Sequence, residues 1–169
     1  DRHAHARDAQ QAGPQGRRAL CRAGGRLGRR LGARAGRRGG GDSRTAFIMD
    51  SILKDVILRG TGMKAKTLNR TDVAGKTGTT NGPRDAWFSG YTSHLAVTAW
   101  VGFDDNSSIG LSEYGGSAAL PMWIDFIGAA LEGRPDTERL PPSGIVRVKI
   151  DPKTGKRLGS NLKGIFEYF

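Results

Sequence analysis

Cysteine is almost absent from this 169-residue sequence, because Cys21 is the only one. No disulfide can form within the chain, so cysteine usage does not indicate a redox compartment. No hydrophobic run is long enough to span a bilayer or to form the core of a signal peptide, and we expect no anchoring or export signal in these residues. The three histidines, His3, His5 and His94, are too dispersed to assemble a metal site. We therefore expect no metal and no cofactor.

Residues 1–44 lack Ile, Val, Phe, Tyr, Trp, Met and Lys altogether. Arg, Gly and Ala dominate, and 12 of the 27 basic residues lie here against three Asp, a net charge of +9. Such a segment has almost nothing to bury and cannot offset the entropy of ordering, which predicts disorder, with at most transient helix near residues 26–38. The other 125 residues carry only two excess positive charges, so the high isoelectric point belongs to the first segment.

Three interpretations of this first segment stay open. An Arg-rich tail can contact nucleic acid or an anionic membrane surface through counterion release, although it lacks the interleaved aromatic residues of a stacking platform. It can also be an inert natural tail. We favour a third interpretation, a frame change or a mis-assigned start, because GC-rich codons read out of register encode Arg, Gly, Ala and Pro, and an ordinary alphabet returns near Arg44. We expect no specific nucleic-acid partner.

Two amphipathic helices are predicted in the remaining chain. The first covers residues 46–58, where apolar residues recur at the three-and-four spacing of a helix face, with Ser43 or Thr45 as its N-cap and Gly60 at its end. The second covers about residues 120–131, with Pro121 in its first turn, where a missing amide donor costs least. Gly133 should end it.

Three strands are predicted between these helices, at residues 73–80, 86–91 and 95–103, the last two joined by a hairpin turn at 92–94. The third strand is apolar on both faces, which is typical of a strand inside a covered sheet. Helix, three antiparallel strands and helix together predict an α+β fold with helices packed on a sheet. Two helices should leave the opposite face and one edge of this sheet without cover.

A Pro-containing linker and a small β appendage are predicted for residues 134–169. Pro141 and Pro142 favour a linker, whereas Val146, Val148 and Ile150 alternate with basic residues as in a solvent-facing strand. We thus expect three parts: residues 1–44, a body of residues 45–133, and the appendage.

The most informative motif is Lys76-Thr77-Gly78-Thr79-Thr80, on the first predicted strand. Lys76 supplies a compact cation, and Thr77 and Thr79 supply hydroxyl donors at alternate positions on the same strand face. Together they can bind one carboxylate. Gly78 points to the other face and allows a close approach by whatever packs there. A surface strand with these side chains in water is the alternative.

The run from Ala74 to Asp105 resembles the third conserved box and following hairpin of class A penicillin-binding proteins, the bifunctional glycosyltransferase-transpeptidases of peptidoglycan synthesis. The resemblance covers about residues 45–169 and extends particularly to the Gram-negative 1A-type members; Gly60-Thr61-Gly62, the helix from Leu120 and the closing residues also look like that family. It implies a partial β-lactamase/transpeptidase-like fold. It also implies a protein on the periplasmic face of a bacterial inner membrane.

The resemblance further implies roles for single residues. The strand edge at Lys76, Thr77, Gly78 and Thr79 would pair with the D-Ala-D-Ala end of a stem peptide or with a β-lactam, and the Thr79 amide would contribute to an oxyanion hole. The family also uses a Ser-x-x-Lys box and a Ser-x-Asn box upstream of Lys-Thr-Gly. Ser51-Ile52-Leu53-Lys54 fits the first box in letters only, because it lies 25 residues before Lys76 with no Ser-x-Asn between them.

We therefore interpret Ser51 and Lys54 as helix-surface residues and expect no catalytic nucleophile in this chain. The leading hypothesis is a part of a D,D-transpeptidase. A non-catalytic remnant that binds β-lactam or stem peptide, and an Arg-tail nucleic-acid binder, are the alternatives. Gly60 to Ala65 also matches a dinucleotide-binding pattern, but it follows a predicted helix rather than a strand, so we reject nucleotide binding.

Overall fold

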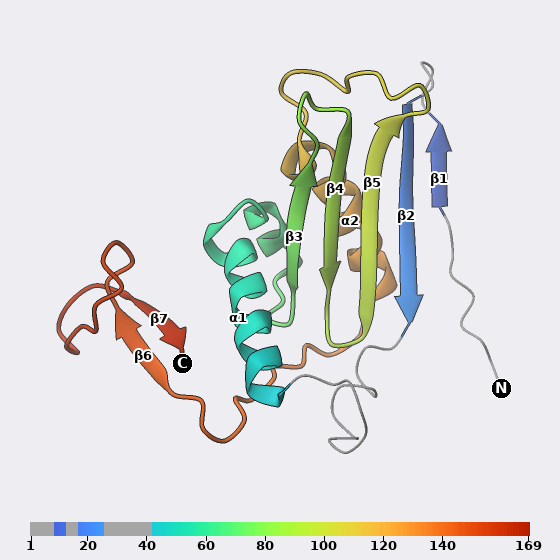
Figure 1. Cartoon of the computed structure of the whole chain (residues 1–169). Helices are drawn as coiled ribbons and strands as arrows, with labels where there is room; N and C mark the ends of the chain where they lie inside the picture. Colours follow the sequence, from blue (N-terminus) through green and yellow to red (C-terminus); the bar gives the residue numbers. More distant parts are fainter. Residues whose placement is uncertain (1–8, 13–16, 26–41) are drawn as a thin grey trace.

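The computed structural model describes residues 9–12, 17–25 and 42–169 (Figure 1). Its main sheet has five antiparallel strands in the order β1-β2-β5-β4-β3. Their bounds are β1 (Ala9–Ala12), β2 (Arg17–Gly25), β3 (Ala74–Thr79), β4 (Asp85–Tyr91) and β5 (Leu95–Phe103). The three strands expected from the sequence are confirmed as β3, β4 and β5, and β3 forms one edge of the sheet.

The first helix, α1 (Ser43–Arg59), confirms the helix expected over residues 46–58 but begins earlier. Its N-cap is Asp42, whose carboxylate accepts a hydrogen bond from the Arg44 amide at 3.1 Å, rather than Ser43 or Thr45. The sequence pattern missed this cap because the first turn carries no apolar residue. Gly60 ends the helix as expected.

The second helix, α2 (Leu120–Ala130), follows a single π-helical turn, η2 (Gly115–Ala119). Pro121 lies in the first turn of α2, as predicted, and Gly133 adopts a positive φ of 70° just beyond its end. A short 3-10 helix, η1 (Met63–Leu68), links α1 to the sheet. Among the helices of the described ranges, none combines the length and apolar character that a bilayer crossing requires.

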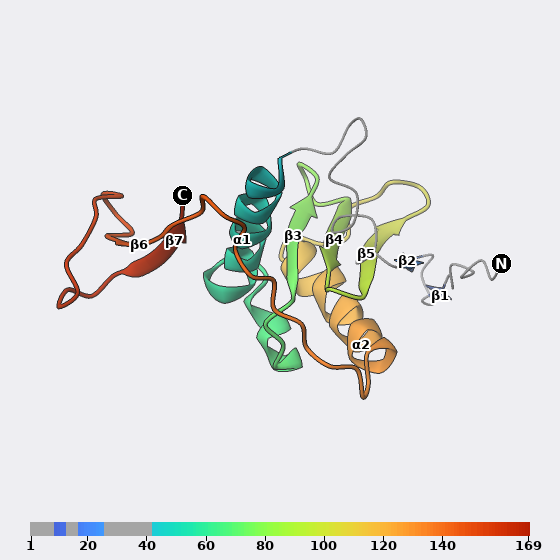
Figure 2. The same cartoon turned by 90° about the horizontal axis from the view of Figure 1, so that it is seen from below.

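The two helices lie on opposite sides of the sheet, with α2 behind it in Figure 1 and α1 in front of it beside β3, as the view in Figure 2 also shows. The core lies between α2 and the sheet. Trp123 is fully buried there, with its ring edge-on to Phe88 at 4.9 Å and its indole N–H donating to the Val97 carbonyl at 3.0 Å. Burial of these large rings stabilises the body of the protein.

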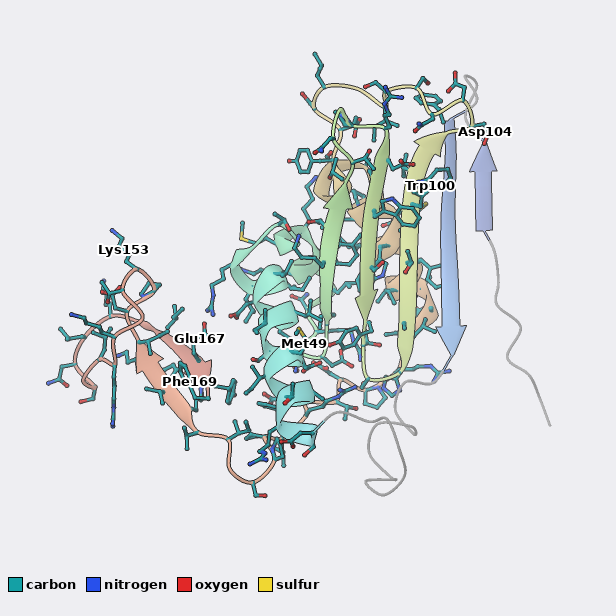
Figure 3. All side chains as sticks on the ribbon, in the orientation of Figure 1. Met49, Trp100, Asp104, Lys153, Glu167 and Phe169 are labelled. Atoms are coloured by element: carbon teal, nitrogen blue, oxygen red, sulfur yellow. The ribbon has the colours of Figure 1, made fainter. Side chains whose placement is uncertain are left out.

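The front face of the sheet is only partly covered. Tyr91 lies under α1 and donates a hydrogen bond to the buried Asp50 carboxylate at 2.9 Å. Burial, together with the negative charge of Asp50, raises the pKa of the Tyr91 phenol. Further along the face, Trp87 remains 42% exposed, and Trp100 stands 6.0 Å from it on β5 (Figure 3). The expectation of an uncovered face is confirmed at these two side chains, within the residues described.

Within residues 1–44, for which the sequence predicts disorder, the structure has the strands β1 and β2, and Ser43 and Arg44 begin α1. β2 pairs with β5 along all nine residues, from Arg17 opposite Phe103 to Gly25 opposite Leu95. Backbone ladders need no particular side chains, so a segment with little to bury can still satisfy the unpaired amides and carbonyls of an edge. The β5 side of the three-strand group β3–β4–β5 is therefore paired, and the edge without a partner strand among the described residues is β3. The transient helix near residues 26–38 lies outside the described residues.

Asp72 fastens the start of β3 to the hairpin turn between β4 and β5. Its carboxylate accepts two hydrogen bonds from Arg70, both at 2.9 Å, and two from the amide and hydroxyl of Ser93 at 3.2 and 2.5 Å. Burial would raise the pKa of Asp72, but the hydrogen bonds from Arg70 and Ser93 outweigh it and hold the pKa well below its usual range. Asp136 adds a second clasp by accepting from the Thr71 amide at 2.6 Å.

The C-terminal strands β6 (Arg147–Ile150) and β7 (Ile165–Tyr168) form a separate antiparallel pair. No residue from 132 to 169 is buried, and the pair stands to one side of α1 in Figure 1. Tyr168 meets the Phe47 ring edge-on at 5.0 Å, and Glu167 accepts a hydrogen bond from Arg59 at 2.5 Å. These side chains are what hold the hairpin to the body, because a lone two-stranded hairpin is only marginally stable.

Candidate functional site

The strand β3 brings Lys76, Thr77 and Thr79 together at the edge of the sheet. Thr77 and Thr79 share the face toward α2, as the pairing of Thr77 with Phe88 shows, whereas Lys76 stands opposite Ser89 on the front face. The Lys76 ammonium nevertheless bends over the strand and donates to the carbonyl and hydroxyl oxygens of Thr77, at 2.9 and 3.2 Å. A cation and two hydroxyls therefore gather along one free edge.

Lys76 is exposed, and no carboxylate among the described residues forms an ion pair with it. Its strongest contacts are with neutral oxygens of the neighbouring residue. An ammonium in this state attracts an anion without first having to break an ion pair. The edge is thus electrostatically suited to a carboxylate.

Thr79 is held from the opposite side by η2. Its hydroxyl oxygen accepts a hydrogen bond from the Gly115 amide at 3.1 Å. A Cβ at position 115 would overlap the carbonyl oxygen of Trp87 and lie 2.7 Å from that of Gly78, so only glycine can approach this closely. The close approach expected at Gly78 thus occurs at its backbone, and Gly115 is the residue that permits it.

Two contacts at this edge were not predicted from the sequence. One is the Gly115 amide on Thr79, and the other is a hydrogen bond between the hydroxyls of Thr61 and Thr77 at 2.6 Å. The paired glycines at 115 and 116 were a usable signal, since adjacent glycines outside a turn indicate close backbone approach. Thr61 carried no such signal beyond its two flanking glycines.

The hairpin that carries the motif is closed by Thr80 and Asp85. The Thr80 hydroxyl oxygen accepts from the amides of Arg84 and Asp85, at 3.1 and 2.9 Å. Asp85 in turn accepts a hydrogen bond from the Trp100 indole at 2.8 Å. These bonds fix the register of β3 against β4, and therefore the direction in which Thr77 and Thr79 point.

Ser51 and Lys54 do not form a nucleophile and base pair. The Ser51 hydroxyl donates to the carbonyl of Ile48 within α1 at 2.8 Å, and the Lys54 ammonium pairs with Asp50 at 3.2 Å. Both side chains are half-buried rather than on the helix surface as expected. A second Ser-x-x-Lys, at residues 160–163, lies in the loop between β6 and β7, downstream of Lys76.

A cavity of about 440 Å³ lies elsewhere, between α1 and the C-terminal hairpin. Its lining includes Asp50, Lys54, Arg139 and Tyr168 but none of the residues of β3. Lys54 and Arg139 both approach the single Asp50 carboxylate, at 3.2 and 3.9 Å. The charged side chains that line this cavity are paired with one another, so we do not place the functional site there. The described residues contain no cluster of His, Cys, Asp and Glu that could hold a metal ion.

Comparison with known proteins identifies the family. No family model matches the chain. The penicillin-binding protein 1A of Pseudomonas aeruginosa is 52% identical over 129 residues, which are 76% of this chain and 16% of that protein. Over this part of its length, the chain is homologous to penicillin-binding protein 1A. The family member of Neisseria lactamica is 45% identical over 105 residues, 62% of this chain and 13% of that protein.

The fold agrees with this family. The crystal structure of penicillin-binding protein 1A from Haemophilus influenzae matches 76% of this chain and 20% of that one, with a TM-score of 0.67 and 37% identity. The α+β arrangement of helices and antiparallel strands thus corresponds to part of a penicillin-binding protein 1A, as the resemblance of residues 45–169 implied. The chain spans about one sixth of the length of the Pseudomonas relative.

Proposed function

We propose that residues 45–133 form the substrate-binding edge of a peptidoglycan D,D-transpeptidase, with residues 134–169 as an appendage to it. The carrying observation is the gathering of Lys76, Thr77 and Thr79 on an edge strand where Lys76 has no carboxylate partner among the described residues. The ligand is the C-terminal carboxylate of a stem peptide that ends in D-Ala-D-Ala, or the carboxylate of a β-lactam.

The peptide lies beside β3 and continues the sheet at its free edge. Lys76 neutralises the carboxylate while the hydroxyls of Thr77 and Thr79 donate hydrogen bonds to it. The amide of Thr79 stabilises the oxyanion that forms when the peptide bond is attacked. Gly78 has no side chain, so nothing projects from β3 between Thr77 and Thr79.

These residues bind and orient the peptide but supply no nucleophile. Acyl transfer needs an activated serine, and the Ser51 hydroxyl is already bonded to its own helix. We assign the serine nucleophile of the parent enzyme to residues other than these 169. Peptidoglycan glycosyltransfer, and residence on the periplasmic face of the inner membrane, belong to that parent enzyme.

Equilibrium binding tests this function. We expect the chain to bind acetyl-D-Ala-D-Ala and penicillin reversibly, with the Lys76→Met variant at least about tenfold weaker because one charge-assisted hydrogen bond is lost. Lys64→Met, on η1, is the matched control and should bind like the original chain. Fluorescent penicillin should leave no covalent label. Equal affinity in the Lys76→Met variant, or covalent label at Ser51, would contradict the assignment.

A further inference from the structure

The turn after α1 has a geometry that its function as a helix end does not require. The amides of Gly60 and Gly62 both donate to the Val56 carbonyl, at 3.1 and 2.9 Å, so the chain doubles back around Thr61. A Cβ at Gly60 would lie 2.8 Å from the Val56 backbone, and one at Gly62 would lie 2.8 Å from the Ile57 side chain. Glycine is therefore needed at position 60, where the close contact is with backbone atoms, and the turn fixes where Thr61 lies.

Thr61 is directed at the motif strand. Its hydroxyl lies 2.6 Å from that of Thr77, and its carbonyl oxygen lies 3.0 Å from where a Cβ on Gly116 would stand. Thr61 thus lies between η2 and β3, and it remains exposed to solvent. The glycines that mimic a dinucleotide motif in the sequence serve to place this one side chain.

The contact between Thr61 and Thr77 affects how many hydrogen bonds the Thr77 hydroxyl can still form with a ligand. A hydroxyl has one proton to donate and two lone pairs that accept. The Lys76 ammonium, which can only donate, occupies one lone pair of Thr77 at 3.2 Å. Thr61 then either donates into the second lone pair or accepts the proton of Thr77. In both arrangements one proton of the two hydroxyls remains to be donated outward, beside the charge of Lys76.

We propose that Thr61 is a positioning residue of the carboxylate site: its hydroxyl pairs with that of Thr77 so that one proton of the pair is directed outward as a donor, which selects an anionic over a neutral chain end. This inference rests on the proposed function of β3. It adds Thr61 to the residues that recognise the terminal carboxylate of the peptide. A C-terminal carboxamide is disfavoured because its NH₂ group would have to face Lys76 and an oriented donor.

The test compares Thr61→Val with Thr61→Ser in the full chain. Valine keeps the shape and removes the hydroxyl, whereas serine keeps the hydroxyl. Acetyl-D-Ala-D-Ala and its C-terminal carboxamide are titrated against each variant. We expect Thr61→Val to weaken carboxylate binding about fivefold, the usual effect of one hydrogen bond, while carboxamide binding changes little. Thr61→Ser should restore the affinity and the preference.

Thr67→Val is the matched control, because the Thr67 hydroxyl donates to the Lys64 carbonyl at 2.9 Å outside the site. It should leave both ligands unaffected. A merely structural Thr61 would weaken both ligands equally, or neither, and that result would overturn the inference. If the original chain binds the carboxylate no better than the carboxamide, the proposed function itself fails. If it does discriminate and Thr61→Val discriminates equally well, only the role of Thr61 fails.

Discussion

The two edges of the strand group β3–β4–β5 are completed in different ways. At β3, the Thr61 hydroxyl from the turn after α1 and the Gly115 amide from η2 converge on Thr77 and Thr79, and Lys76 contacts Thr77 within the strand. At β5, the partner strand is β2, which consists of Arg, Ala, Leu, Cys and Gly and pairs with β5 at nine successive positions. Side-chain chemistry specifies the first edge, whereas the second is described by its backbone pairing.

This difference explains why an unusual sequence can join the sheet at β5. A ladder accepts any residue that can adopt an extended conformation and offer its amide and carbonyl groups. Residues 17–25 therefore need not have been selected for this position. The same tolerance is not available at β3, where a Cβ on Gly115 would overlap the neighbouring strand.

The largest expected effect comes from the core that supports both edges. Trp123→Ala should lower the free energy of unfolding by about 3–5 kcal/mol, since a fully buried indole is removed. Urea denaturation followed by circular dichroism measures this loss. Trp87→Ala, at a position 42% exposed, is the control and should cost clearly less. Equal losses would show that α2 does not form the core described.

Asp72→Asn should come next, at about 1–3 kcal/mol, because Arg70 loses its ionic partner. The effect depends on pH. The folded pKa of Asp72 lies below the value of about 3.9 expected when unfolded, so its contribution is complete above that value and disappears as pH falls toward the folded pKa. Urea titrations from pH 7 to pH 2 should show the two proteins converging below about pH 4. A difference that stays constant from pH 7 to pH 2 would contradict this clasp.

Gly115→Ala should break the β3 edge while leaving the core in place. The added methyl group forces η2 away from Gly78 and Trp87, at a cost of about 1–3 kcal/mol, and removes the amide from Thr79. Binding of acetyl-D-Ala-D-Ala should fall with it. Gly159→Ala, where a Cβ meets nothing within 4 Å, is the matched control and should change neither stability nor binding. Unchanged binding in the Gly115→Ala variant would show that η2 does not contribute to the binding site.

Cys21→Pro should have the smallest effect on the whole molecule. Proline at the pair of Cys21 with Ala99 removes a ladder donor in the middle of β2. We expect faster amide hydrogen exchange in β5 with a change of less than about 1 kcal/mol in global stability, because we expect β1 and β2, which come first in the chain, to open as a local unit. Ligand binding at β3 should not change. Cys21→Ser serves as the control. Unaltered exchange throughout β5 would mean that residues 17–25 do not pair with it.

The sequence predicted the elements that have a local signature. The limits of β5 were predicted because apolar residues occupy both of its faces along the whole strand. Those of α2 were predicted from the helical spacing of its apolar residues and from Pro121 in its first turn. The N-terminus of α1 was misplaced because its cap, Asp42, lies in the segment dominated by Arg and Gly. The strand β2 had no local signature, because the segment lacks the β-branched and aromatic residues typical of strands, and only its pairing with β5 reveals it.

The site was predictable to a similar degree. Lys76, Thr77 and Thr79 were chosen because neighbouring positions on a strand are brought together by its geometry alone. Thr61 and Gly115 were missed because they reach Thr77 and Thr79 from 16 and 36 residues away in sequence, and only the folded chain makes them neighbours. The residues that orient the motif are therefore less visible in the sequence than the motif itself.

The most direct test is an NMR titration of the ¹⁵N-labelled chain with acetyl-D-Ala-D-Ala. If β3 is a carboxylate-binding edge, the shift changes will centre on the amides of Thr77 and Thr79 and will disappear in the Lys76→Met variant. Changes centred instead on the cavity around Asp50 and Tyr168, or equal changes with and without Lys76, would contradict the account.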